Sequence, residues 1–114
     1  MTKNITIRKA NGKWVVRAGG AVLAESENAL ELTEGDMPAV IYFPREDIAM
    51  PFLEPSDQVT ECPFKGKASY FSIETKSETI QNAAWSYEAP TDEAAEIKNY
   101  VAFYTSGKVA VEQL

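Results

Sequence analysis

The sequence predicts a mainly β protein built from antiparallel strands, with one short helix near residues 92–98. Two observations support this prediction. Segments in which apolar and polar residues alternate recur along the chain, and residue pairs that favour tight turns, such as Asn11-Gly12 and Gly19-Gly20, separate them. Alternation of this kind is typical of strands with one buried and one solvated face. The helix is expected after Thr91, because a capping hydroxyl and acidic residues in the first turn stabilise a helix N-terminus.

The first strands are expected to form a meander. Residues 3–10 alternate, and Asn11-Gly12 follows at the point where a type I′ hairpin turn requires two positive φ angles. Pairing across this turn would set Ile7 opposite Val16. Residues 21–25 would then return as a third strand of the same sheet.

The later strands are predicted from short apolar runs that end at turn residues or prolines. Pro44 ends one of them, because proline lacks the backbone donor of a ladder, and a turn or short helix is expected there, with Asp47 accepting bonds from nearby backbone amides. Residues 49–67 show no sustained period and are interpreted as a long functional loop. Residues 100–104 fit either a helix or a strand, and their β-branched and aromatic content favours a strand. The predicted strands are residues 30–32, 40–43, 68–74, 79–87, 100–104 and 109–111.

Length, charge and composition limit the class of protein. At 114 residues the chain is expected to be one domain, residues 1–114, with a core of its own. Its net charge of −6 predicts no nucleic-acid partner, because an acidic surface repels phosphate backbones. No stretch approaches the roughly 20 apolar residues that span a bilayer, and the N-terminus does not read as a signal peptide. A cytoplasmic location without a membrane partner is therefore expected.

Residue types exclude several kinds of chemistry. The chain has no histidine and a single cysteine, Cys62. Nucleophilic Ser-His and Cys-His pairs are therefore excluded, and a thiolate zinc site cannot form within one chain. The sequence therefore points to no catalytic residue, no metal ligand and no cofactor, and it leaves open whether the protein is an enzyme.

The candidate site residues come from the second part of the chain. Eleven of the twelve aromatic residues lie from Tyr42 onward, and tyrosine and tryptophan combine an apolar body with a polar tip suited to a partly hydrated pocket. Arg45 follows a rigid proline and offers a planar fork for carboxylate or phosphate, unless it forms a structural pair with Asp47 or Glu46. Lys65 could add a second cation, and Cys62 is either a thiolate nucleophile or a small buried thiol. The predicted ligand-binding residues are Tyr42, Arg45, Asp47, Cys62, Lys65, Tyr70, Trp85 and Tyr87.

Six segments carry a resemblance to a known family. They are Tyr42-Phe43-Pro44-Arg45-Glu46-Asp47, Leu53-Glu54-Pro55-Ser56-Asp57, Cys62-Pro63-Phe64-Lys65-Gly66, Ala68-Ser69-Tyr70, Ala84-Trp85-Ser86-Tyr87 and Tyr100-Val101-Ala102-Phe103-Tyr104. The pattern resembles domain-of-unknown-function family 427, which is also labelled nucleotidyltransferase family nine. This resemblance implies a β-tent-like fold, similar to methionine sulfoxide reductase B and the ligand-binding domain of cereblon. Those relatives usually carry a four-cysteine zinc site, which a chain with one cysteine cannot form.

The predicted function is that of an uncharacterised small-molecule-binding domain. Aromatic side chains would line its pocket, and Arg45 and Lys65 would anchor a small anionic or polar metabolite, with Asp47 orienting Arg45. The resemblance supports a pocket, because cereblon-like relatives bind small ligands in an aromatic cage. Two alternatives remain open. One is an enzyme that uses Cys62 thiol chemistry, or magnesium-dependent nucleotidyl transfer through Asp47 and Asp57. The other is a protein-interaction module without a ligand.

Overall fold

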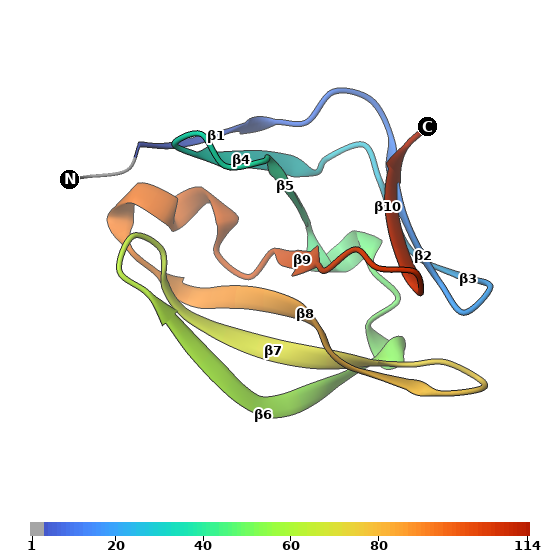
Figure 1. Ribbon diagram of the computed structural model, residues 1–114. Helices are drawn as coiled ribbons and strands as arrows, with labels where there is room; N and C mark the ends of the chain where they lie inside the picture. The colour runs from blue at the N-terminus through green and yellow to red at the C-terminus, as the bar shows by residue number, and fades with distance from the viewer. Residues whose placement is uncertain (1–3) are drawn as a thin grey trace.

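The computed structural model describes residues 4–114, which form ten β-strands in two antiparallel sheets and three short 3₁₀ helices (Figure 1). The predicted mainly β, antiparallel fold is confirmed. The strands are β1 (Ile5–Lys9), β2 (Trp14–Ala18), β3 (Ala21–Ser26), β4 (Leu30–Glu34), β5 (Val40–Phe43), β6 (Leu53–Cys62), β7 (Gly66–Glu74), β8 (Thr79–Pro90), β9 (Val101–Phe103) and β10 (Val109–Gln113). The helices are η1 (Arg45–Asp47), η2 (Met50–Phe52) and η3 (Asp92–Ile97).

The two sheets differ in size and shape. The larger has seven strands in the order β1-β4-β5-β9-β8-β7-β6, and the smaller has the order β10-β2-β3. Figure 1 shows the large sheet curled, with β1 and β4 on one side and β6, β7 and β8 on the other. Helix η3 lies at one end between the two sides, where it contacts both β1 and β8. We call the face inside this curl the inner face.

The predicted hairpin between the first two strands is wrong. Strand β1 pairs with β4, which sets Ile7 opposite Leu32, whereas β2 lies in the other sheet and sets Val16 opposite Ala24. Gly12 has the positive φ that a tight turn requires, but Asn11 does not. The turn sequence therefore allows the chain to reverse without requiring the flanking strands to pair. The other hydrogen-bonding edge of β2 is taken by β10, so β2 is the central strand of the small sheet.

The predicted long loop over residues 49–67 is also wrong, because η2 and the ten-residue strand β6 occupy most of it. Strand β6 lies at the edge of the large sheet, and most of its side chains are exposed. Its register with β7 shifts between Pro55 and Val59. An edge strand with little burial and an irregular register lacks the alternation by which sequence patterns reveal strands.

The remaining predicted elements are confirmed. The strand over residues 40–43 is β5, the ambiguous segment near residue 101 is the strand β9, and the short helix near residues 92–98 is η3. Helix η3 is a 3₁₀ helix with a break at Ala94, so it is less regular than the capping pattern suggested. No helix among residues 4–114 is long and apolar enough to cross a membrane.

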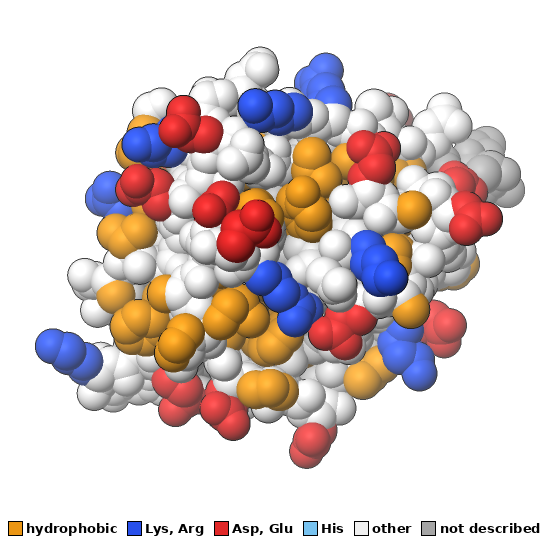
Figure 2. Space-filling model, turned by 180° about the vertical axis from the view of Figure 1, so that it is seen from behind, with side chains coloured by type: hydrophobic (Ala, Val, Ile, Leu, Met, Phe, Trp, Pro, Cys, Tyr) orange, Lys and Arg blue, Asp and Glu red, His pale blue; other side chains and the backbone are white. Residues whose placement is uncertain are grey.

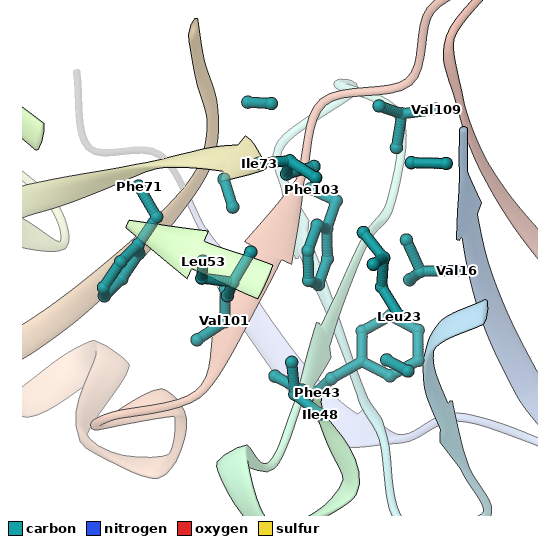
Figure 3. Packing of buried hydrophobic residues seen from close by; sticks show 14 of the residues in the cluster. Val16, Leu23, Phe43, Ile48, Leu53, Phe71, Ile73, Val101, Phe103 and Val109 are labelled. Atoms are coloured by element: carbon teal, nitrogen blue, oxygen red, sulfur yellow. The ribbon is translucent and has the colours of Figure 1, made fainter. Parts of the chain in front are cut away.

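Two hydrophobic clusters cover opposite faces of the large sheet. The inter-sheet cluster lies between the two sheets, and its packing is shown in Figure 3; it includes Val16, Leu23, Phe43, Ile48, Leu53, Phe71, Ile73, Val101, Phe103 and Val109. The inner-face cluster consists of Leu32, Tyr42, Ala68, Tyr70, Tyr87, Ala94, Ile97 and Ala102. On the outside, charged side chains of both signs are interspersed with small groups of hydrophobic atoms, as Figure 2 shows for one face.

Candidate ligand site on the inner face

Strand alternation directs the aromatic side chains to the inner face. Successive side chains of a strand point to opposite faces, so Tyr42 lies on the inner face, whereas Phe43 packs in the inter-sheet cluster. The register between β7 and β8 sets Tyr70 opposite Trp85 and Tyr87 opposite Ala68, which brings three aromatic side chains together.

Lys65 lies in the hairpin between β6 and β7, and its side chain extends to the aromatic residues of the inner face. Its Nζ atom lies 2.6 Å from Oε1 of Glu34 and 5.9 Å from the centroid of the Tyr87 ring. The side chains of Lys65 and Glu34 are only 15% and 9% exposed, so the ion pair is shielded from water. Cys62, at the start of this hairpin, is partly buried against the inner-face cluster.

A row of aromatic rings connects the site to the surface. The Trp85 indole donates a hydrogen bond to the Tyr42 hydroxyl over 3.3 Å, and the ring of Tyr104 lies 4.3 Å from that of Trp85, between centroids. The Tyr70 hydroxyl is hydrogen-bonded to Thr60 Oγ1 at 3.0 Å and to the Tyr104 hydroxyl at 3.3 Å. Because Thr60 and Tyr104 are exposed, this end of the row opens to solvent.

Tyr87 differs from its neighbours in that its hydroxyl makes no hydrogen bond within residues 4–114, although the residue is only 6% exposed. No fully buried side-chain nitrogen or oxygen in this part of the chain lacks a partner. The hydroxyl of Tyr87 must therefore reach a space that water can enter. A buried side chain whose single polar atom meets such a space is suited to donating a hydrogen bond to a ligand.

Burial keeps the tyrosines of this site neutral. It raises the pKa of Tyr42 to about 12, and it raises the pKa of Tyr87 far above the ordinary value for a phenol. Charge interactions with Cys62 and Glu34 contribute to both increases, but less than burial does. The two phenols are therefore hydrogen-bond donors throughout the physiological pH range.

Six of the eight predicted site residues come together on the inner face, namely Tyr42, Cys62, Lys65, Tyr70, Trp85 and Tyr87. Sequence reasoning missed Glu34 and Thr60. Glu34 carried a usable signal, because it continues the inward alternation of Leu30 and Leu32 and so places a carboxylate where an apolar side chain is expected. Thr60 lies on the irregular strand β6, which the sequence did not reveal.

Arg45 and Asp47 lie elsewhere, and the expectation that Asp47 orients Arg45 is wrong. The Arg45 guanidinium donates to the Asn99 carbonyl at 2.7 Å, to Ser86 Oγ at 3.2 Å and to Glu88 at 3.0 Å. Ser86 lies between Trp85 and Tyr87 in β8, so its side chain points away from the inner face. Asp47 accepts a hydrogen bond from Ser26 at 2.6 Å rather than from backbone amides. Both residues fix η1 to the surrounding strands.

The aspartates of the nucleotidyl-transfer alternative are also apart from the site. Asp47 contacts β3, whereas Asp57 borders a polar hollow lined by residues of β6, β7 and β8. Within residues 4–114, no group of three or more cysteine, aspartate or glutamate side chains could hold a metal ion.

These observations define a class of protein: a mainly β domain whose curled antiparallel sheet encloses tyrosine hydroxyls, a thiol and a shielded ion pair. The chain belongs to the family described as a domain of unknown function, family 427, whose model matches residues 6–113. The family model bears a nucleotidyltransferase label, but its description states no activity. No curated protein matches the chain.

Proposed function

We propose that this domain binds a small polar or anionic metabolite at the inner face, between Tyr42, Trp85 and Tyr87. The observation that carries the proposal is the Tyr87 hydroxyl, which is unpartnered within residues 4–114 and belongs to a side chain that is 6% exposed. We further infer a β-tent-like arrangement of the sheets, in line with the family resemblance, and a cytoplasmic location, as expected from the sequence.

The chemistry of the site favours a ligand with a carbonyl or carboxylate oxygen. The phenols of Tyr42 and Tyr87 are neutral donors, and Tyr42 accepts from Trp85, which leaves its own proton free to donate. Lys65 adds a positive charge that Glu34 already balances, so the ligand need not carry a full negative charge. The aromatic rings would form the walls, as is usual for small-molecule sites.

A thiol-dependent enzyme is the second candidate, because Cys62 lies in the same cluster as Lys65 and Tyr87. If this candidate is right, Cys62→Ser removes turnover while ligand affinity stays within about twofold. If binding alone is the function, the substitution changes neither stability nor affinity appreciably.

A thermal-shift screen against carboxylates, amides and nucleotides, with and without magnesium, tests the proposal. A compound at about a hundred times its Kd stabilises the folded state by about 2.7 kcal/mol, which is several degrees for a domain of this size. Tyr87→Phe keeps the ring and its packing and removes only the hydroxyl, so it should weaken binding about tenfold.

Arg45→Gln is the matched control, because Arg45 lies on the opposite face of β8. It should lower the melting temperature of the free protein without changing the shift caused by the ligand. A ligand whose affinity depends on Arg45 and is unaffected by Tyr87→Phe would place the site elsewhere.

A further inference from the structure

A groove opens where the large sheet splits. Strands β5 and β9 pair at only two positions, Tyr42 with Ala102 and Phe43 with Val101. Beyond these pairs the strands separate, and a hollow of about 450 Å³ lies between the start of β5, the end of β9 and the small sheet. Its volume is within the range of small-molecule sites.

Aromatic side chains line this groove, and the polar atoms of Trp14, Trp85 and Tyr104 already form hydrogen bonds within the protein. The Trp14 indole donates to the Asn11 carbonyl at 3.0 Å, the Trp85 indole donates to Tyr42, and the Tyr104 hydroxyl is bonded to Tyr70. The aromatic side chains of the groove therefore offer ring surfaces rather than free donors. An occupant held by ring surfaces gains most if it carries a positive charge, because the face of an aromatic ring is electronegative.

The groove carries a negative charge, which suits a cationic ligand. Glu31 is the one charged residue that lines it within residues 4–114, and no lysine or arginine does so. Glu31 is ion-paired with Arg8 at 2.7 Å, but the Arg8 side chain is 73% exposed. Such a solvated pair is weak, so the carboxylate remains available to another cation. The net charge of −6 attracts cations to the whole surface.

We propose that this groove binds a small free quaternary ammonium compound, with its alkylated cation among the rings of Trp14, Trp85 and Tyr104 and near the carboxylate of Glu31. A quaternary nitrogen has no proton to donate, so it needs no acceptor beyond the ring faces and one carboxylate. This proposal goes beyond the inner-face site, whose donors suit an acceptor oxygen. Trp85 and Tyr104 border both sites, whereas Trp14 and Glu31 belong to the groove.

Calorimetric titration with choline tests the proposal, with 3,3-dimethylbutan-1-ol as the neutral isostere. Choline should bind at least about fivefold more tightly than the alcohol, because both pack against the rings but only choline gains cation–π attraction from them and charge attraction from Glu31. Equal affinities would overturn the proposal, since they would show that the groove selects for shape alone. Absence of choline binding at low ionic strength would overturn it as well.

Substitutions of groove residues test where the cation binds. Trp14→Leu should weaken choline binding about five- to tenfold, and Glu31→Gln should weaken it about threefold. Arg8→Gln should instead strengthen binding about twofold, because it removes the competing cation from Glu31. Glu31→Gln keeps the size of a side chain that is 23% exposed, so it should leave the fold intact even if Trp14→Leu does not. Binding that is indifferent to both Glu31→Gln and Arg8→Gln would refute the assignment.

Tyr87→Phe separates this proposal from the proposed function. It removes a hydroxyl on the inner face and none of the groove residues, so choline affinity should not change. Loss of choline binding in Tyr87→Phe would move the cation to the inner face and overturn the groove assignment.

Discussion

Lys65 and Glu34 form the most shielded ion pair in residues 4–114, with side chains 15% and 9% exposed. Lys65→Met leaves the Glu34 carboxylate without its counter-charge in an apolar setting, so we expect the free energy of unfolding to fall by about 3 kcal/mol. Urea denaturation at neutral pH measures this loss. Lys13→Met is the matched control, because Lys13 and Glu25 are 3.6 Å apart and about half exposed, and it should cost less than about 1 kcal/mol. Equal losses would show that the Lys65 pair is not shielded.

Burial of Tyr42 predicts a loss of stability in alkali. Its folded pKa of about 12 lies above the value of 10.0 for an exposed phenol. The stabilisation from keeping this phenol neutral is therefore fully present below pH 10 and is lost as the pH rises through 12. The loss is on the order of 2 to 3 kcal/mol. Denaturation curves from neutral to alkaline pH measure it, and Tyr42→Phe should show a smaller decline than the parent. An identical decline would mean that other groups cause the effect.

Side-chain direction was predictable only where strand alternation is regular. Tyr42, Tyr70, Trp85 and Tyr87 lie on well-defined strands, and the sequence placed them together correctly. The direction of Arg45 depends on how η1 leaves the sheet after Pro44, and no local pattern encodes that angle. The partner of Lys65 could not be predicted either, because Glu34 reaches it only when the large sheet curls.

Gly66 begins β7 and supports the hairpin that positions Cys62 and Lys65. Its φ of +113° is a conformation that other residues rarely adopt, and an added Cβ would lie 3.1 Å from the Ala89 carbonyl oxygen. Gly66→Ala should therefore lower the free energy of unfolding by about 1–3 kcal/mol. Chemical denaturation measures the change. Gly107→Ala is the control, because its added Cβ meets nothing within 4 Å, and it should stay within about 0.5 kcal/mol of the parent. If Gly66→Ala leaves the free energy of unfolding unchanged, the hairpin must be able to shift and make room for the added Cβ.

The sequence predicted strands more reliably than it predicted their partners. The period of β1 identified it as a strand with Ile5 and Ile7 on one face, and that prediction is correct. Its partner is nevertheless β4, with Ile7 opposite Leu32, because strand pairing is decided by which arrangement buries both apolar faces. Burial also explains why β6 was missed. Most of its side chains are exposed at the edge of the sheet, so apolar and polar residues do not alternate along it.

The two hydrophobic clusters share the strands of the large sheet, so we expect the unfolding of one to be coupled to that of the other. Phe43, Phe71 and Val101 pack in the inter-sheet cluster, whereas the residues adjacent to them in sequence, Tyr42, Tyr70 and Ala102, pack in the inner-face cluster. Loss of either cluster exposes one face of the strands that carry the other. The clusters should therefore unfold together.

The two tryptophans can test this coupling, because Trp14 packs against the inter-sheet cluster and Trp85 against the inner-face cluster. Trp14→Phe leaves a reporter of the inner face, and Trp85→Phe leaves a reporter of the space between the sheets. Within each variant, the urea midpoint from fluorescence should equal the midpoint from far-UV circular dichroism, as a two-state transition requires. If one tryptophan responds at a lower urea concentration than the dichroism does, its cluster unfolds separately, and the shared strands do not couple the two faces of the sheet.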